Sequence, residues 1–211
     1  MINIDKLKPT TFLNLSRRDL PYCGDLSKPF FACIGCSHTA GISVNYKDSW
    51  PNQLATMFNM EHINLGFEGS DLSYQSEKID QLFDLLPQLE FCIWMQTYPT
   101  RSRKSLKLLG DTNRRIIVNS IWEDKKTLQS LLEHTKQHVS NKKILILNTW
   151  HYPNKYIKIL NAKFRNTNNY WINNNTITDY GFDGAHSGPI TQKKLATDLY
   201  EYIVNNNMFG K

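Results

Sequence analysis

Apolar runs of strand length alternate with stretches of helical spacing from residue 30 to the end of the chain. The runs that predict strands lie at 30–34, 61–65, 89–97, 143–150 and 170–172. Apolar residues recur at helical spacing in 49–58, 71–86, 123–139, 154–164 and 190–205, whereas the short run 116–118 fits a strand or a helix. Strands that are apolar throughout and alternate with helices are typical of a parallel sheet covered on both faces. The pattern therefore predicts an α/β fold: a three-layer α/β/α sandwich with a central, mostly parallel five-stranded sheet.

The first 28 residues lack this periodicity and contain two prolines. Such a segment is typical of an extended arm laid over a domain. We therefore expect an N-terminal arm at 1–28 and one domain at 29–211, because a chain of 211 residues is long enough for a single well-buried core.

Composition and charge narrow the class of protein. Hydrophobic residues make up 40% of the chain, and 25 Lys and Arg against 19 Asp and Glu give a net charge of +6, which excludes collagen, a coiled coil and wholesale disorder. The charge raises the alternative of a nucleic-acid-binding protein, but the basic residues are scattered among acidic ones, so a solvated surface is favoured. No apolar run approaches the roughly 18 to 20 residues that span a bilayer. No signal peptide is visible either, so we expect a cytoplasmic protein.

The four cysteines predict neither a disulfide framework nor a metal site. Cys33 and Cys36 form a C-x-x-C pair, but Cys33 falls inside a predicted strand, whereas a redox pair normally opens a helix. A zinc site would need two further ligands, and Cys23 and Cys92 have no matching spacing. We interpret the thiols as mostly reduced and expect no metal and no cofactor.

Polar and glycine-rich residues follow the strands at the edge where a parallel sheet binds its ligands. In an open α/β sheet, ligands lie beyond the carboxyl ends of the strands. Residues 35–41 (GCSHTAG) follow the first predicted strand, residues 64–70 (NLGFEGS) end the second, and residues 183–186 (DGAH) precede the last helix. These segments supply a serine, two glycine-rich turns, and an Asp three residues before a His.

Together these residues can perform acyl transfer. A serine hydroxyl becomes a good nucleophile when an imidazole takes its proton, and a carboxylate must fix the tautomer of that imidazole. Ser37, His186 and Asp183 can fill these three roles. The oxyanion needs preorganised donors, and the backbone N–H groups of Ser37 and Gly69 are candidates because glycine-rich turns expose them. A purely structural turn is the alternative for Ser37, and the nearby Asp183 and His186 favour the nucleophile.

The three segments resemble the blocks of the SGNH, or GDSL, hydrolase family, and they occur in the same order. Residues 35–41 are similar to Gly-Asp-Ser-x-Thr-x-Gly, residues 64–69 to an Asn-x-Gly-x-x-Gly turn, and Asp183 and His186 to the final Asp-x-x-His. The resemblance implies a flavodoxin-like architecture with Ser37 as nucleophile, His186 as general base and then acid, and Asp183 as its orienting partner. It also implies that the same two N–H groups line the oxyanion hole.

Two positions depart from the family pattern. Cys36 stands where the family has Asp, a residue with a structural role at the nucleophile turn. The third block, Gly-x-Asn-Asp, is absent, because the chain has MQTYPTR at 95–101, so the family's oxyanion Asn is missing. Gln96 or Thr97 could replace this donor, whose loss typically costs about 100- to 1,000-fold in turnover. Arg101 could contact an anionic or sugar substrate, although an exposed surface arginine is the commoner case.

We therefore predict a serine hydrolase that cleaves an ester through a Ser37 acyl-enzyme, for example an O-acetyl or acyl group on a carbohydrate or lipid. The expected partner is a small-molecule or carbohydrate ester and no specific nucleic acid. The missing third block motivates an alternative: a catalytically weak or inactive member of the same fold that binds a glycan or a protein.

Overall fold

The fold follows the predicted pattern in the part of the chain that the structure describes. In this computed structural model the described residues are 22–97, 133, 137, 142–148, 170–173 and 177–210. Outside them lie residues 1–21 of the predicted arm, the run 116–118, the predicted helix 154–164 and all but two residues of the helix predicted at 123–139. Those two residues, Glu133 and Gln137, are helical.

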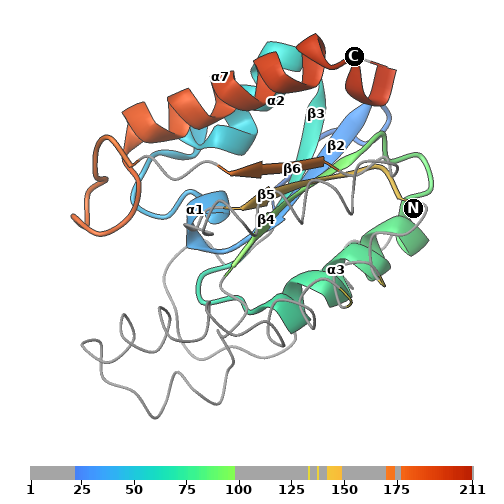
Figure 1. Cartoon of the computed structure of the whole chain (residues 1–211), viewed down its shortest axis with the longest axis horizontal. Helices are drawn as coiled ribbons and strands as arrows, with labels where there is room; N and C mark the ends of the chain where they lie inside the picture. Colours follow the sequence, from blue (N-terminus) through green and yellow to red (C-terminus); the bar gives the residue numbers. More distant parts are fainter. Residues whose placement is uncertain are drawn as a thin grey trace.

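Six strands form one sheet in the described residues (Figure 1). They are β1 (Tyr22–Cys23), β2 (Phe30–Gly35), β3 (Glu61–Gly66), β4 (Cys92–Gln96), β5 (Ile144–Asn148) and β6 (Tyr170–Asn173), in the order β1-β3-β2-β4-β5-β6. Each pair of neighbouring strands in the order β3-β2-β4-β5-β6 is parallel. These five strands confirm the predicted five-stranded, mostly parallel sheet. Their order is that of flavodoxin-like sheets. The two-residue β1, which the hydrophobic pattern did not predict, pairs antiparallel with β3 at the edge.

The order of the strands changes direction at β2, which lies between β3 and β4. Gly35 at the end of β2 is paired with Gly66 at the end of β3, so these two strands stop at the same level. In sheets of this kind the ligand crevice opens beyond the carboxyl ends at this change of direction. The segments that follow β2 and β3 therefore lie where a ligand is expected.

Helices cover both faces of the sheet (Figure 1). The helices α2 (Trp50–Phe58) and α7 (Pro189–Asn205) lie together on one face, and α3 (Leu72–Leu85) lies on the other. The remaining helical segments are short: α1 (Ser37–Ala40), η2 (Tyr46–Asp48) and η4 (Met208–Gly210). The three-layer α/β/α prediction is therefore confirmed.

Alternate residues of β2 supply the two hydrophobic cores. Phe30 and Ile34 belong to the cluster that packs against α3. Phe31 and Cys33, which point to the opposite face, belong to the cluster that packs against α2 and α7. Burial of both faces explains why the strand is apolar at every position.

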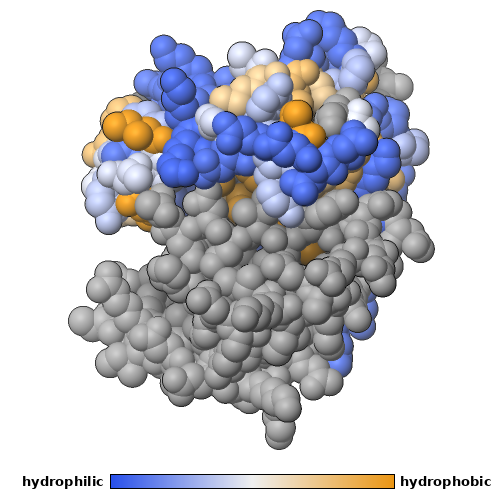
Figure 2. Space-filling model, turned by 45° about the horizontal axis from the view of Figure 1, so that its top comes forward, coloured by the Kyte–Doolittle hydropathy of each residue, from blue (hydrophilic) through white to orange (hydrophobic). Residues whose placement is uncertain are grey.

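The surface on the α7 side is mostly hydrophilic, with separate hydrophobic side chains between polar ones (upper part of Figure 2). The large hydrophobic side chains that are exposed in the described part of the chain are Ile177, Tyr180, Phe182, Ile190 and Val204. Among the described helices, none is both long enough and apolar enough to cross a bilayer.

His62 is a buried histidine in β3. Its ring stacks on those of Phe31 and Tyr46, with both pairs of centroids 5.9 Å apart, and the residue is 2% exposed. Tyr46 Oη and His62 Nε2 share a hydrogen bond. Burial lowers the pKa of His62 from its ordinary value of 6.5 to about 4. The ring is therefore neutral in the folded protein at neutral pH.

Acidification is expected to destabilise the fold through His62. The unfolded chain protonates this ring near its ordinary pKa of 6.5, whereas the folded chain does so only near 4. The free energy of unfolding is therefore not reduced by His62 above about pH 6.5. It falls as the pH drops below that value, by on the order of 3 kcal/mol near pH 4. Urea unfolding of the parent and of His62→Gln at about pH 7 and pH 5 measures this effect. We expect a smaller pH dependence in the variant, and equal dependence in both proteins would contradict the assignment.

Candidate active site

Ser37 lies in the first turn of α1, directly beyond the end of β2. Cys36 is the N-cap of this helix, and Gly41 ends it in the left-handed conformation with a φ of 71°. Ser37 is 5% exposed. The first N–H groups of a helix have no acceptor within the helix, so the Ser37 amide can donate to a developing oxyanion.

The helix α1 packs on the ends of β2 and β3 through glycines. A Cβ on Gly66 would lie 2.2 Å from the backbone N of Ala40, and a Cβ on Gly35 would lie 2.1 Å from Thr39 Oγ1. Asn64 adds two hydrogen bonds at this contact, because its Oδ1 accepts from Gly66 N and its Nδ2 donates to Thr39 O, both at 2.9 Å. The predicted Asn-x-Gly-x-x-Gly segment thus fixes the position of the helix that begins with Ser37.

Gly69 lies in the turn that follows β3. Its φ of 73° is in the left-handed region that favours glycine. The turn is tied to the end of β2, since Phe67 N and Ser70 Oγ both donate to Gly35 O at 2.9 Å. In the described part of the chain, no hydrogen bond engages the N–H of Gly69. The two predicted oxyanion donors therefore follow neighbouring strands at the same edge of the sheet.

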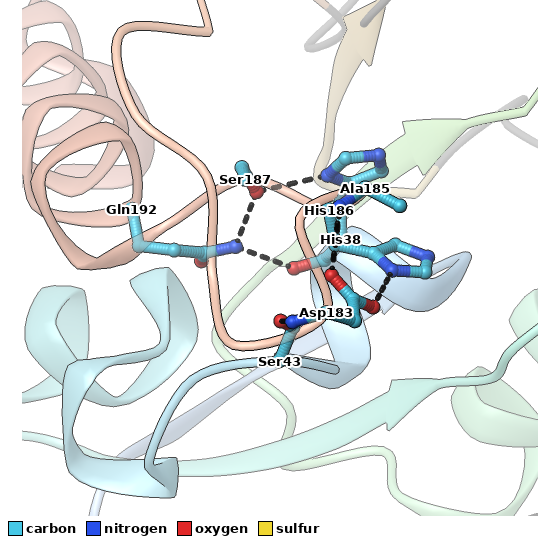
Figure 3. A network of polar contacts seen from close by, with 7 residues as sticks. All are labelled: His38, Ser43, Asp183, Ala185, His186, Ser187 and Gln192. Atoms are coloured by element: carbon cyan, nitrogen blue, oxygen red, sulfur yellow. Dashed lines mark hydrogen bonds and ion pairs between the residues drawn. The ribbon is translucent and has the colours of Figure 1, made fainter.

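Asp183 and His186 form the contact that the sequence predicts (Figure 3). Asp183 Oδ2 lies 2.5 Å from His186 Nδ1, and Asp183 Oδ1 accepts from the backbone N–H groups of Ala185 and His186 at 2.9 and 3.0 Å. Partial burial raises the pKa of Asp183, but these hydrogen bonds outweigh it and hold the pKa well below its ordinary value. The ionised carboxylate accepts the Nδ1 proton of a neutral His186, so the Nε2 lone pair can act as a base.

The loop that carries this pair is anchored on Ser43. Asp183 N donates to Ser43 Oγ at 2.8 Å, and Phe182 N donates to Ser43 O at 3.0 Å. A Cβ on Gly181 would lie 2.2 Å from Ser43 O, so this approach depends on a glycine. Nothing in the sequence pointed to Ser43, because its contact with Asp183 spans 140 residues.

Ser37 and His186 lie at the same edge of the sheet without a hydrogen bond between them. The ring of His38, the residue after Ser37, has its centroid 5.4 Å from that of His186. Within the described residues, no hydrogen bond joins Ser37 Oγ to His186. Catalytic hydrogen bonds commonly tighten only in the complex with substrate, so this geometry is compatible with a nucleophile and its base.

The residues predicted to replace the missing Asn lie at the end of β4. Gln96 is the last residue of that strand, Thr97 follows it, and both are buried. Thr97 N donates to Gln75 Oε1 at 3.3 Å, and Gln75 Nε2 donates to Ser70 Oγ at 2.9 Å, which connects this end of β4 to the Gly69 turn. Arg101 lies outside the described residues.

The buried cysteines have no cross-link. Cys33, Cys36 and Cys92 are free thiols. Burial raises the pKa of Cys33 and of Cys92, so these two keep their protons at neutral pH. Across the described ranges, no three His, Cys, Asp or Glu side chains come together as a metal ion would require.

The strand order, the serine beyond the first parallel strand and the Asp–His pair before the last helix define a fold of the SGNH, or GDSL, hydrolase kind. The chain is similar to a G-D-S-L family lipolytic protein from Veillonella parvula, with a TM-score of 0.56 and 16% identity over 83% of this chain and 98% of that one. It is also similar to the acetyl xylan esterase Est2A from Butyrivibrio proteoclasticus, with a TM-score of 0.55 and 12% identity over 87% of this chain and 65% of that one.

A third similar structure is a carbohydrate esterase family 2 enzyme with a carbohydrate-binding domain from Corynascus thermopiles, with a TM-score of 0.56 and 12% identity. The chain covers 66% of that protein, so it spans only about two thirds of either esterase. No protein-family model and no curated protein matches the sequence. Identities this low show the fold alone.

Gly66→Ala is expected to destabilise the protein by displacing α1. The new Cβ would lie 2.2 Å from a backbone atom of Ala40, which cannot move without its helix. Such overpacking typically costs about 1–3 kcal/mol. Gly24→Ala is the matched control, because its Cβ would first meet the flexible carboxylate of Glu61. Denaturant midpoints compare the two variants, and an equal loss of stability in both would contradict the close contact of α1 with β3.

Proposed function

We propose that this protein is a serine hydrolase that cleaves esters, with Ser37 as nucleophile, His186 as general base and then acid, and Asp183 as its orienting partner. The observation that carries the proposal is the contact of Asp183 with His186 at the edge of the sheet where α1 begins with Ser37. The names of two similar structures, an acetyl xylan esterase and a carbohydrate esterase, support an ester as the bond that is cleaved.

The geometry suggests how the groups share the reaction. His186 Nε2 takes the proton of Ser37 as Oγ attacks the ester carbonyl carbon, and ionised Asp183 stabilises the imidazolium. The tetrahedral intermediate then expels the alcohol, which takes its proton from His186. Water hydrolyses the acyl-enzyme in the same way, with His186 again as base, and releases the acid.

The oxyanion of each tetrahedral intermediate is held by the N–H groups of Ser37 and Gly69. A third donor comes from Gln96 or Thr97 in place of the missing Asn. This assignment is supported by the position of β4 next to β2, because the carboxyl ends of neighbouring parallel strands meet at one edge. Donors placed in advance at this edge need no reorganisation when charge develops on the carbonyl oxygen.

Exposed apolar side chains beside the pair favour an ester over a polyanion as the ligand. Phe182, which directly precedes Asp183, is 77% exposed, Tyr180 is 62% exposed, and Ile190 at the start of α7 is also exposed. These side chains can bury the acyl chain of an ester or the apolar face of a sugar ring.

Ser37→Ala is expected to remove nearly all hydrolysis of short p-nitrophenyl esters, by a factor on the order of 10³ or more, because the variant lacks the nucleophile. Ser76→Ala is the matched control, since Ser76 is a buried serine on α3 whose hydroxyl donates to Leu72 O. The measurement is the steady-state kcat/KM of the parent, Ser37→Ala and Ser76→Ala. Equal rates in Ser37→Ala and the parent would show that Ser37 is not the nucleophile.

Asp183→Asn is expected to lower kcat by a factor on the order of 10³–10⁴ without unfolding the protein, because an amide no longer selects the tautomer of His186 that has a basic Nε2. The carboxylate stays ionised in the parent down to acidic pH, since the pKa of Asp183 lies well below its ordinary value. The parent's pH–rate profile should therefore show no loss of activity from protonation of Asp183 in the mildly acidic range. A variant that keeps more than about a tenth of the parent's kcat would exclude the orienting role.

A further inference from the structure

Gln192 is a buried side chain of α7 that binds His38 and Ser187 (Figure 3) and also the first residue of α2. It is 1% exposed. Its Oε1 accepts from Trp50 N at 2.8 Å, and its Nε2 donates to His38 O at 3.1 Å and to Ser187 Oγ at 2.8 Å. Because the Trp50 N–H can only donate, it fixes the orientation of the amide, with both Nε2 protons directed toward the site.

Ser187 extends this contact to the ring of His38. Its Oγ lies 2.9 Å from His38 Nδ1, and the residue is buried. Ser187 Oγ can accept from Gln192 Nε2 and at the same time donate its own proton to His38 Nδ1. With the Ser187 hydroxyl as donor, the ring proton of a neutral His38 lies on Nε2, and this tautomer is the one that we expect.

The two residues that Gln192 binds directly follow the nucleophile and the base in sequence. His38 comes after Ser37, and Ser187 comes after His186. One amide thus holds the backbone beside the nucleophile and the side chain beside the base. The rings of His38 and His186 lie side by side, with their centroids 5.4 Å apart and their planes inclined by 59°.

We propose that Gln192, Ser187 and His38 form a clamp that sets the distance between Ser37 and His186, with Gln192 as a positioning residue. The role rests on the proposed function of Ser37 and His186. Asp183 fixes the tautomer and direction of the His186 ring, whereas the clamp fixes the separation of the two segments that carry nucleophile and base. A displacement of about 1 Å between reacting groups can cost about 100-fold in rate, so loss of the clamp should lower kcat more than it raises KM.

Two substitutions of Ser187 isolate its hydroxyl, because threonine and valine have the same shape. We expect Ser187→Val to lower kcat for p-nitrophenyl acetate by about 10- to 100-fold with KM changed less than about 3-fold, and Ser187→Thr to keep most of the activity. Gln192→Glu keeps the acceptor for Trp50 N and loses both donors, so we expect a similar fall in kcat. Gln53→Glu is the matched control, since Gln53 Nε2 donates to Asp48 O in η2 and, among the described residues, its side chain makes no hydrogen bond to the clamp.

A second measurement does not need hydrolysis. Nitrogen NMR of the histidine rings should show His38 protonated on Nε2 in the parent and in Ser187→Thr, and a changed tautomer ratio in Ser187→Val. Far-UV circular dichroism shows which variants fold. If Ser187→Val does not fold, the tautomer ratio of His38 is measured in Gln192→Glu instead.

The outcomes separate the two proposals. If the parent hydrolyses esters and both Ser187→Val and Gln192→Glu keep its kcat, the clamp is overturned and the proposed function stands. The clamp is also overturned if the tautomer ratio of the His38 ring is the same in Ser187→Thr and Ser187→Val. If the parent hydrolyses no ester while His38 responds to the Ser187 hydroxyl, the hydrogen bonds are upheld and the catalytic role falls with the proposed function.

Discussion

The candidate site depends on how closely α1 approaches the ends of β2 and β3. That approach is available only because Gly35 and Gly66 have no side chains, since a Cβ on Gly66 would lie 2.2 Å from a backbone atom of the helix. Asn64 supports the contact with hydrogen bonds to both sides. The close contact places Ser37 in the first turn of a helix, where its amide has no acceptor within the helix. The positions of the proposed nucleophile and of one proposed oxyanion donor therefore follow from the packing of two glycines.

His186, the proposed base, reaches this edge from the other end of the chain, and polar contacts hold its loop there. Ser43 binds the loop that contains Asp183, and Gln192 binds the residue after Ser37 and the residue after His186. Buried polar groups are costly unless they are paired, so the hydrogen bonds of Gln192 favour one arrangement of the two segments. The same physics that satisfies the buried amide of Gln192 thereby aligns the groups proposed to react.

The sequence predicted the parts of this structure that local periodicity encodes. Strands buried on both faces are apolar at every position, and the described helices bury one face, so β2, β3, α2, α3 and α7 could be placed within a residue or two. The strand predicted at 89–97 is shorter in the structure, where β4 covers Cys92–Gln96. Leu89 and Phe91 are buried without belonging to the strand, so the apolar run extends beyond the hydrogen-bonded ladder. The edge strand β1 has two residues and no period to detect.

The residues of the candidate site likewise include some that the sequence could identify and others that it could not. Ser37, Asp183 and His186 could be selected because each lies in a short segment with a recognisable spacing, whereas Ser43, Ser187 and Gln192 act through contacts that link distant parts of the chain.

The most direct test of the account is reaction with a fluorophosphonate followed by peptide mass spectrometry. The account predicts an adduct on Ser37 that forms in the parent and fails to form in His186→Ala. No adduct on Ser37, or an adduct that forms equally fast in His186→Ala, would contradict it.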